Sequence, residues 1–160
     1  MSTQTHSLDI RQFLNRHLVE VFETMLSLPA EALPADPGIA FPTRVTGSVG
    51  FGGDNVTGAV YFHLAEPFAI QCACAMLGLS AAEINKENDV NDVVGEMTNM
   101  LAGGLKSALC DTGHVCAVST PAIIRGTAFE IEALPDVHRE MLYFQSGPEP
   151  VIVEVHIKYN

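Results

Sequence analysis

The sequence predicts an α+β domain in which an antiparallel sheet is covered by helices on one face. The elements follow in the order helix, two strands, two helices, then three or four further strands. Two of the helices are long and carry apolar stripes that need a sheet to bury them. Short turn segments separate the strands in pairs, as in antiparallel hairpins.

Length and composition fit a single domain over residues 1–160. The chain has 160 residues, of which 48% are hydrophobic, and this is enough for one sizeable core. Its 8 basic and 19 acidic residues give a formal charge of −11. Nucleic acid and anionic membranes are therefore unfavourable partners, because phosphate binding requires clustered Lys and Arg.

The first ten residues, MSTQTHSLDI, contain no basic segment followed by an apolar core. We therefore expect neither a signal peptide nor a membrane span, and a cytoplasmic location. In that compartment the cysteines are expected to be reduced. The spacings Cys72-Ala-Cys74 and His114-Val-Cys116 match zinc-binding patterns only loosely, so small buried thiols are expected rather than a metal site.

The first half of the chain predicts a long helix and a hairpin. Residues 8–28 carry apolar side chains at helical spacing, with Ser7 or Asp9 as the cap and Pro29 near the end. Residues 29–42 contain four prolines and predict an irregular crossing segment. Residues 43–49 and 56–64 predict two strands around a glycine-rich turn. The second strand alternates between two faces, so one face is expected to be buried and His63 to be a surface or edge residue.

The middle of the chain predicts two helices. Glu66-Pro67 begins a short helix that ends at about Leu77, before Gly78. A polar connection over residues 80–88 follows, in which Ser80 and Glu83 fit a capping box. Residues 89–110 then predict a second long helix with an apolar arc made of Val93, Val94, Met97, Met100, Leu101, Leu105 and Ala108.

The last part of the chain predicts further strands. Residues 115–124 fit a strand that Pro121 interrupts, which suits an edge or a bulge. Residues 127–134 fit either a strand or a loop. Residues 137–145 and 151–159 predict a closing hairpin around the turn at 146–150.

The helix at 89–110 carries an unusual polar stripe opposite its apolar arc. Asp92, Glu96, Asn99 and Gly103 stack along one line of the helix. Solvated helix faces usually carry several long charged side chains, whereas this segment has a single lysine. The glycine leaves the backbone open to a close neighbour. The stripe therefore predicts a docking face, although Asp92 alone could be a favourable charge at a helix start.

The spacing of Asp92, Glu96 and Asn99, with Thr120-Pro121 downstream, resembles the motif of the CheC/CheX/FliY family of bacterial chemotaxis phosphatases. The segments NDVVGEMTNMLAGGLKSAL and STPAII are more similar to CheX than to CheC members. The resemblance implies a single CheX-like domain whose α+β fold contains an internal pseudo-repeat.

The first helix does not repeat the motif. Counting from Asp9, a second copy would place an acid at position 13 and an amide at position 16, but the sequence has Phe13 and Arg16. The resemblance therefore implies a chain with one site, because CheC-type members carry the motif in both halves.

The resemblance also implies an activity, namely hydrolysis of the aspartyl phosphate on a CheY-like response regulator. In this interpretation Asn99 orients the attacking water, and Glu96 pairs with the active-site lysine of the receiver domain. Asp92 and Gly103 flank the docking surface. The Mg²⁺ ion belongs to the receiver site, and this chain needs no cofactor of its own.

Two further expectations follow from the resemblance. CheX-like proteins are typically dimers joined through their sheets, so we expect a symmetric homodimer, with the apolar last strand as the candidate edge. Because a fold does not compel an activity, a docking module without catalysis, for a signalling or flagellar-switch partner, is the alternative function.

Overall fold

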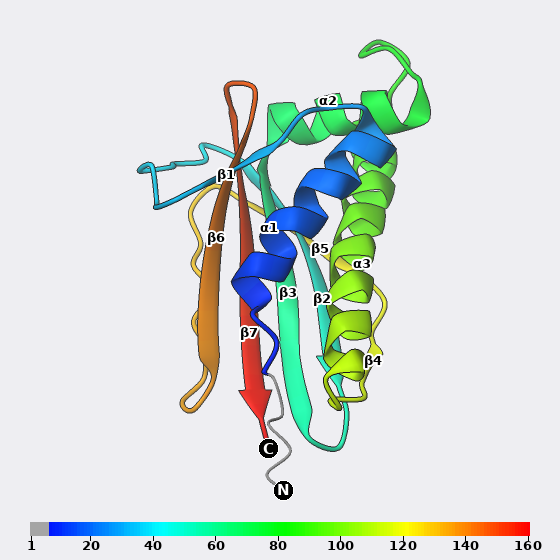
Figure 1. Ribbon diagram of the computed structural model, residues 1–160. Helices are drawn as coiled ribbons and strands as arrows, with labels where there is room; N and C mark the ends of the chain where they lie inside the picture. Colours follow the sequence, from blue (N-terminus) through cyan, green and yellow to red (C-terminus); the bar gives the residue numbers. More distant parts are fainter. Residues whose placement is uncertain (1–6) are drawn as a thin grey trace, which may run out of the picture.

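Residues 7–160, which the computed structural model describes, form a seven-stranded sheet and three α-helices (Figure 1). The expectation about a signal peptide rests partly on residues 1–6, which lie outside this range. The helices are α1 (Ile10–Val21), continued by a π-helical turn η1 (Phe22–Leu26), α2 (Glu66–Leu77) and α3 (Asn88–Asp111). The strands are β1 (Glu31–Leu33), β2 (Arg44–Gly52), β3 (Val56–Ala65), β4 (Ala117–Val118), β5 (Ala122–Gly126), β6 (His138–Ser146) and β7 (Glu149–Tyr159).

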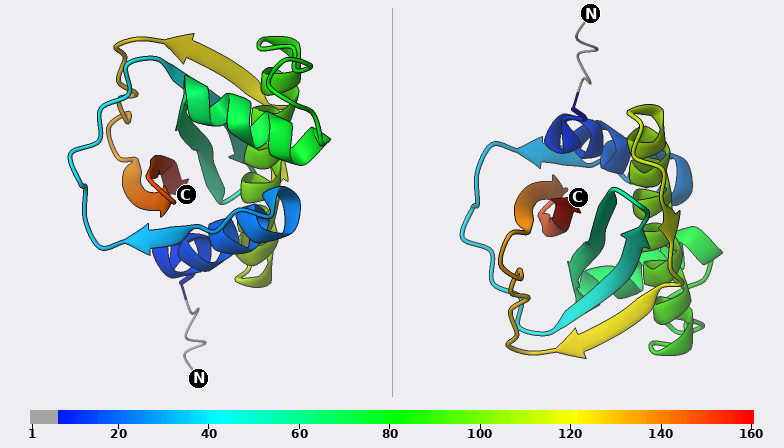
Figure 2. Two further views of the ribbon diagram at one scale, coloured as in Figure 1. Left: turned by 90° about the horizontal axis from the view of Figure 1, so that it is seen from above. Right: turned by 90° about the horizontal axis from the view of Figure 1, so that it is seen from below.

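The strand order in the sheet is β1-β6-β7-β3-β2-β4, and β5 also pairs with β2. All the pairings are antiparallel. Helix α3 packs on β2 and contacts both α1 and α2, as Figure 2 shows from two ends of the molecule. The predicted fold class, an antiparallel sheet with helices on one face, is confirmed. The order of a long helix followed by strands occurs twice, beginning at α1 and again at α3.

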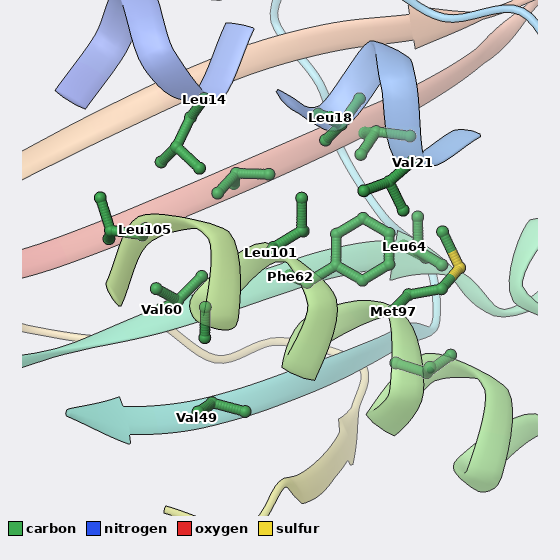
Figure 3. Close-up of a cluster of buried hydrophobic side chains, with 14 of the residues drawn as sticks. Leu14, Leu18, Val21, Val49, Val60, Phe62, Leu64, Met97, Leu101 and Leu105 are labelled. Carbon is green, nitrogen blue, oxygen red and sulfur yellow. The ribbon is translucent and has the colours of Figure 1, made fainter. Parts of the chain in front are cut away.

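The core lies between the sheet and the two long helices (Figure 3). Leu101 and Leu105 of α3 are fully buried, as are Leu14 and Leu18 of α1. Each such side chain contributes about 1.5–3 kcal/mol of transfer free energy when it leaves water. The sheet supplies the opposite wall of this core through residues that include Val49, Val60, Phe62 and Leu64. The predicted apolar stripes of both helices therefore face the sheet and share one core.

The helix ends follow their local sequence. Asp9 caps α1, because its carboxylate accepts a hydrogen bond from the backbone N–H of Gln12 at 3.0 Å. The first helix continues beyond Val21 into the π-helical turn η1. Ser27, in the left-handed conformation (φ 53°), ends it. Gly78 ends α2 with φ 66°, as predicted. Ser80 and Glu83 do pair, but they close a turn ahead of α3 and do not cap the helix itself.

Three predictions about strands are wrong. Residues 29–42 are not wholly irregular, because Glu31–Leu33 pairs with β6. The last strand, β7, is not an edge but lies between β6 and β3. His63 is 1% exposed and therefore neither a surface nor an edge residue. In each case the contact that decides the outcome joins segments far apart in the sequence.

Other predicted elements agree with the structure. The hairpins β2–β3 and β6–β7 form, and β2 ends at Gly52, three residues later than expected. Pro121 does separate two edge strands, since β4 and β5 both pair with β2. Residues 127–134 contain no strand. None of the helices found in residues 7–160 has the length and apolarity that crossing a membrane requires.

The four cysteines are free thiols, of which Cys72 and Cys116 are buried. Burial raises the pKa of Cys72 to about 12, so this thiol stays protonated and packs as a small apolar group. Across residues 7–160 no cluster of His, Cys, Asp and Glu is arranged to hold a metal ion.

Candidate functional site

The polar stripe lies on the face of α3 that points away from the core. Asp92 and Glu96 are exposed, and Asn99 and Gly103 are partly exposed, whereas Met97 between them is fully buried. The side chains of Asp92, Glu96 and Asn99 take part in none of the hydrogen bonds or salt bridges found among residues 7–160. A carboxylate and a carboxamide one turn apart are therefore available to a partner.

Helix α3 sits unusually close to the sheet beneath the stripe. The buried hydroxyl of Thr98 donates a hydrogen bond to the carbonyl of Val94 at 2.7 Å and faces Gly47 on β2. A Cβ atom at Gly47 would overlap the Thr98 side chain. The glycine thus lets the helix approach the strand at the turn that carries Glu96 and Asn99.

Helix α1 holds the other side of α3. The Nε2 atom of His17 lies 3.0 Å from the carbonyl oxygen of Met100, the residue after Asn99. The His17 ring fills the space that a side chain at Gly104 would need, and it stacks on Phe13 with the ring centroids 5.3 Å apart. His17 therefore supports the motif helix, and Phe13, where a second motif would place its acid, packs against the His17 ring.

Two segments secure α3 near its start and along its free flank. The guanidinium of Arg125 on β5 donates hydrogen bonds to the side-chain oxygen of Asn91, the shorter at 2.6 Å. Pro121 lies against Gly95, where an added Cβ would meet the proline ring at 3.5 Å. Pro121 thus forms a wall next to Glu96.

Sequence reasoning did not identify His17, Gly47 or Arg125 as supports of the site. Each acts on α3 from another element, at a separation of dozens of residues. Helical periodicity and motif spacing carry no information about such contacts.

A second polar cluster lies on the other face of the sheet. The carboxylate of Glu154, which is 2% exposed, accepts hydrogen bonds from His63 at 3.1 Å, His156 at 2.7 Å and Arg139 at 2.8 Å. Residues 129–133 cross above this cluster and enclose a cavity of about 550 Å³. Arg44 attaches them to the sheet, with its guanidinium 3.8 Å from the centre of the Phe129 ring.

The charge states in this cluster follow from its contacts. Burial by itself would raise the pKa of Glu154, but the hydrogen bonds from His63, Arg139 and His156 outweigh it and lower the pKa to about 2. Burial lowers the pKa of His63, so its ring is neutral near pH 7. Its Nε2–H then donates to Glu154, and its Nδ1 accepts from the Thr46 hydroxyl at 2.8 Å. With its polar atoms satisfied, this cluster stabilises the sheet.

An exposed Glu-x-x-Asn stripe on a helix packed against an antiparallel sheet is the arrangement expected of the CheC/CheX/FliY class. The family model described as Chemotaxis phosphatase CheX matches residues 45–145, which is more than half of the chain. The chain therefore belongs to the CheX family, as the motif predicted. A comparison with curated protein sequences found no match.

Solved structures of chemotaxis proteins share this fold. The crystal structure of the chemotaxis protein CheX from Vibrio vulnificus is 25% identical with a TM-score of 0.79, and the match covers 98% of this chain and 100% of that one. CheX from Desulfovibrio desulfuricans is 24% identical with a TM-score of 0.76, covering 94% and 100%. The CheX of a CheX–CheY–BeF₃–Mg²⁺ complex from Borrelia burgdorferi shares the fold, with 19% identity, a TM-score of 0.77 and coverage of 95% and 99%.

Proposed function

We propose that this chain, as one domain over residues 1–160, is a phosphatase that stimulates hydrolysis of the aspartyl phosphate on a CheY-like receiver domain. The observation that carries the proposal is the pair Glu96 and Asn99 on the outer face of α3, whose side chains have no hydrogen-bond or salt-bridge partner among residues 7–160. Membership in the family of chemotaxis phosphatases supports the reaction class.

Asn99 suits the role of orienting the water. Hydrolysis needs a water in line with the scissile P–O bond, while the charge on the equatorial oxygens is neutralised. The Mg²⁺ ion and the lysine of the receiver supply that neutralisation, so the helper protein contributes mainly position. A carboxamide both donates and accepts hydrogen bonds without charge, and it can therefore enter a phosphate pocket without repulsion.

Glu96 serves as the anchor in this proposal. It lies three residues before Asn99 on the same exposed face, so both side chains reach one pocket of the partner. Its carboxylate pairs with the receiver's active-site lysine, and Asp92 and Gly103 flank the contact. The net charge of −11 disfavours long-range attraction to an acidic receiver. Screening over roughly 8 Å at cellular salt limits this effect, so close contacts provide the recognition.

The lifetime of the phosphorylated state tests the proposal, measured on a panel of receiver domains from the source organism. We expect the wild-type chain to shorten the lifetime on its cognate receiver. Both Asn99→Ala and Asn99→Asp should lose the effect, the latter because its carboxylate is repelled by the phosphoryl oxygens.

Asn15→Ala on α1, which removes an amide outside the stripe, is the matched control and should keep wild-type activity. An Asn99 variant as active as the wild type would contradict the assigned role. Binding to a receiver without any acceleration by the wild-type chain would replace catalysis with a docking function.

A symmetric homodimer and a cytoplasmic location are also part of this proposal. Because β7 is paired on both sides, a dimer joined through the sheets would have to use an edge strand, β1, β4 or β5. We expect a dimeric mass in solution at micromolar concentration, measured by light scattering coupled to size exclusion. A monomeric mass would contradict the dimer and leave the phosphatase proposal intact.

A further inference from the structure

The stripe on α3 does not end at Gly103. Lys106 follows Asn99 by seven residues and Gly103 by three, so it continues the same line of the helix. It is partly exposed, like Asn99. An added Cβ at Gly103 would meet no atom within 4 Å, so the surface between Asn99 and Lys106 is open. The line therefore carries an anion at Glu96 and a cation at Lys106.

Lys106 has no carboxylate partner among residues 7–160, because the five salt bridges found there involve other residues. Lys106 follows Gly95 by eleven residues, which is about three helical turns, so it lies on the flank of α3 on which Pro121 contacts Gly95.

Lys106 lies too far along α3 from Glu96 and Asn99 to enter the same pocket of the partner. With a rise of about 1.5 Å per residue, Lys106 lies about 10 Å along the helix axis from Asn99 and about 15 Å from Glu96. These distances place Lys106 over the partner's surface outside the pocket that holds the phosphoryl group. A cation there also offsets the repulsion between a chain of charge −11 and an acidic receiver.

We propose that Lys106 pairs with a carboxylate on the receiver's surface and, together with Glu96, fixes the direction in which α3 lies across the receiver. This inference rests on the proposed function. Two opposite charges at the two ends of one line match a complementary pair in one orientation only. Reversing the helix would oppose like charges at both ends, which is a penalty that selects the productive register.

Lys106 is thus a specificity residue and not a catalytic one. An interaction made equally with the bound substrate and the transition state changes KM and leaves kcat unaltered. An attraction between exposed charges also weakens as the salt concentration rises. These two signatures distinguish a contact with the partner from damage to the active site or to the fold.

The test compares Lys106→Glu with Lys158→Glu in steady-state dephosphorylation of the cognate receiver. Both substitutions change the formal charge from −11 to −13, since each removes one of 8 basic residues and adds one to 19 acids. Lys158 is exposed, and it follows the buried Ile157 on the strand, so it projects from the face of the sheet opposite α3. Lys106→Arg is the conservative variant.

We expect Lys106→Glu to raise KM about tenfold at low salt with kcat unchanged, and the increase to shrink as salt is added. Lys158→Glu and Lys106→Arg should stay close to wild type. Thermal melting of each variant checks the fold independently. Equal KM values for the two charge reversals, or a loss confined to kcat, would overturn the inference.

The wild-type reaction in the same assay distinguishes a failure of the role assigned to Lys106 from a failure of the proposed phosphatase function. Acceleration by the wild type together with an unaltered Lys106→Glu variant removes only the role of Lys106. A wild-type chain that accelerates dephosphorylation of no receiver removes the proposed function, and with it the assigned role of Lys106.

Discussion

The chemistry proposed for the stripe depends on which functional group each side chain carries, an amide at Asn99 and a carboxylate at Glu96. Asn99 and an aspartate have nearly the same shape, but only the amide is uncharged and able to donate a hydrogen bond. Glu96 is in the opposite situation, because its pairing with a lysine needs the negative charge. In this proposal Asn99 must be neutral and Glu96 must be negatively charged, although both act on the same phosphorylated site.

A prediction at this scale concerns capture of the partner. Glu96→Ala should weaken binding to a receiver activated with beryllofluoride and Mg²⁺ by about tenfold or more, because the receiver's lysine loses its counter-charge. Isothermal titration calorimetry measures the dissociation constant, with Glu23→Ala on the π-helical turn as the control. Unchanged affinity of Glu96→Ala would count against the pairing with lysine.

At the scale of the element, two adjacent glycines in α3 have opposite surroundings. Gly103 faces open space, whereas a Cβ at Gly104 would overlap the His17 ring that contacts the Met100 carbonyl. A glycine inside a helix costs about 0.5–1 kcal/mol relative to alanine. Packing among residues 7–160 gives no reason for the cost at Gly103, which agrees with a role in close docking.

This contrast predicts opposite effects of one substitution on stability. Gly103→Ala should raise the free energy of unfolding by about 0.5–1 kcal/mol and weaken receiver binding. Gly104→Ala should lower the free energy of unfolding, because the His17 ring must move. Urea denaturation measures both changes. A less stable Gly103→Ala variant, or one that binds the receiver normally, would exclude the docking role.

At the scale of the whole molecule, the two faces of the sheet have different tasks. One face buries the helices and thereby presents α3, while the other holds the cluster of Glu154, His63, His156 and Arg139. Both Glu154 and His63 have pKa values below their ordinary values in the folded state. At acidic pH the unfolded chain therefore binds more protons than the folded one.

The resulting prediction is a loss of stability on acidification. The contribution of His63 is lost as the pH falls through its ordinary value of 6.5 and below. That of Glu154 is lost between its ordinary pKa of 4.5 and about 2. For Glu154 the full effect is on the order of 2–3 kcal/mol. Urea denaturation from pH 7.5 down to pH 2 should show a steady decline, and Glu154→Gln should flatten the part below pH 4.5. A flat wild-type profile would contradict the assigned charge states.

Features that arise from local interactions could be predicted from the sequence. Helix α3, its apolar arc and its polar stripe follow from the repeat of 3.6 residues, and the two hairpins follow from turn residues next to alternating strands. The motif of Asp92, Glu96 and Asn99, together with the flanking helix sequence and Thr120-Pro121 downstream, indicated the CheX family because all of it can be seen in two short segments of the sequence. Such features need only the spacing of residues close in the chain.

The tertiary structure alone decided what depends on distant segments. The burial of His63, the central place of β7 and the pairing of β1 all result from strand order, which local patterns do not specify. The supports of the site, His17, Gly47 and Arg125, act on α3 from elements far along the chain. The physical reason is that a side chain's surroundings are set by packing between elements, whereas periodicity records only which face of its own element it occupies.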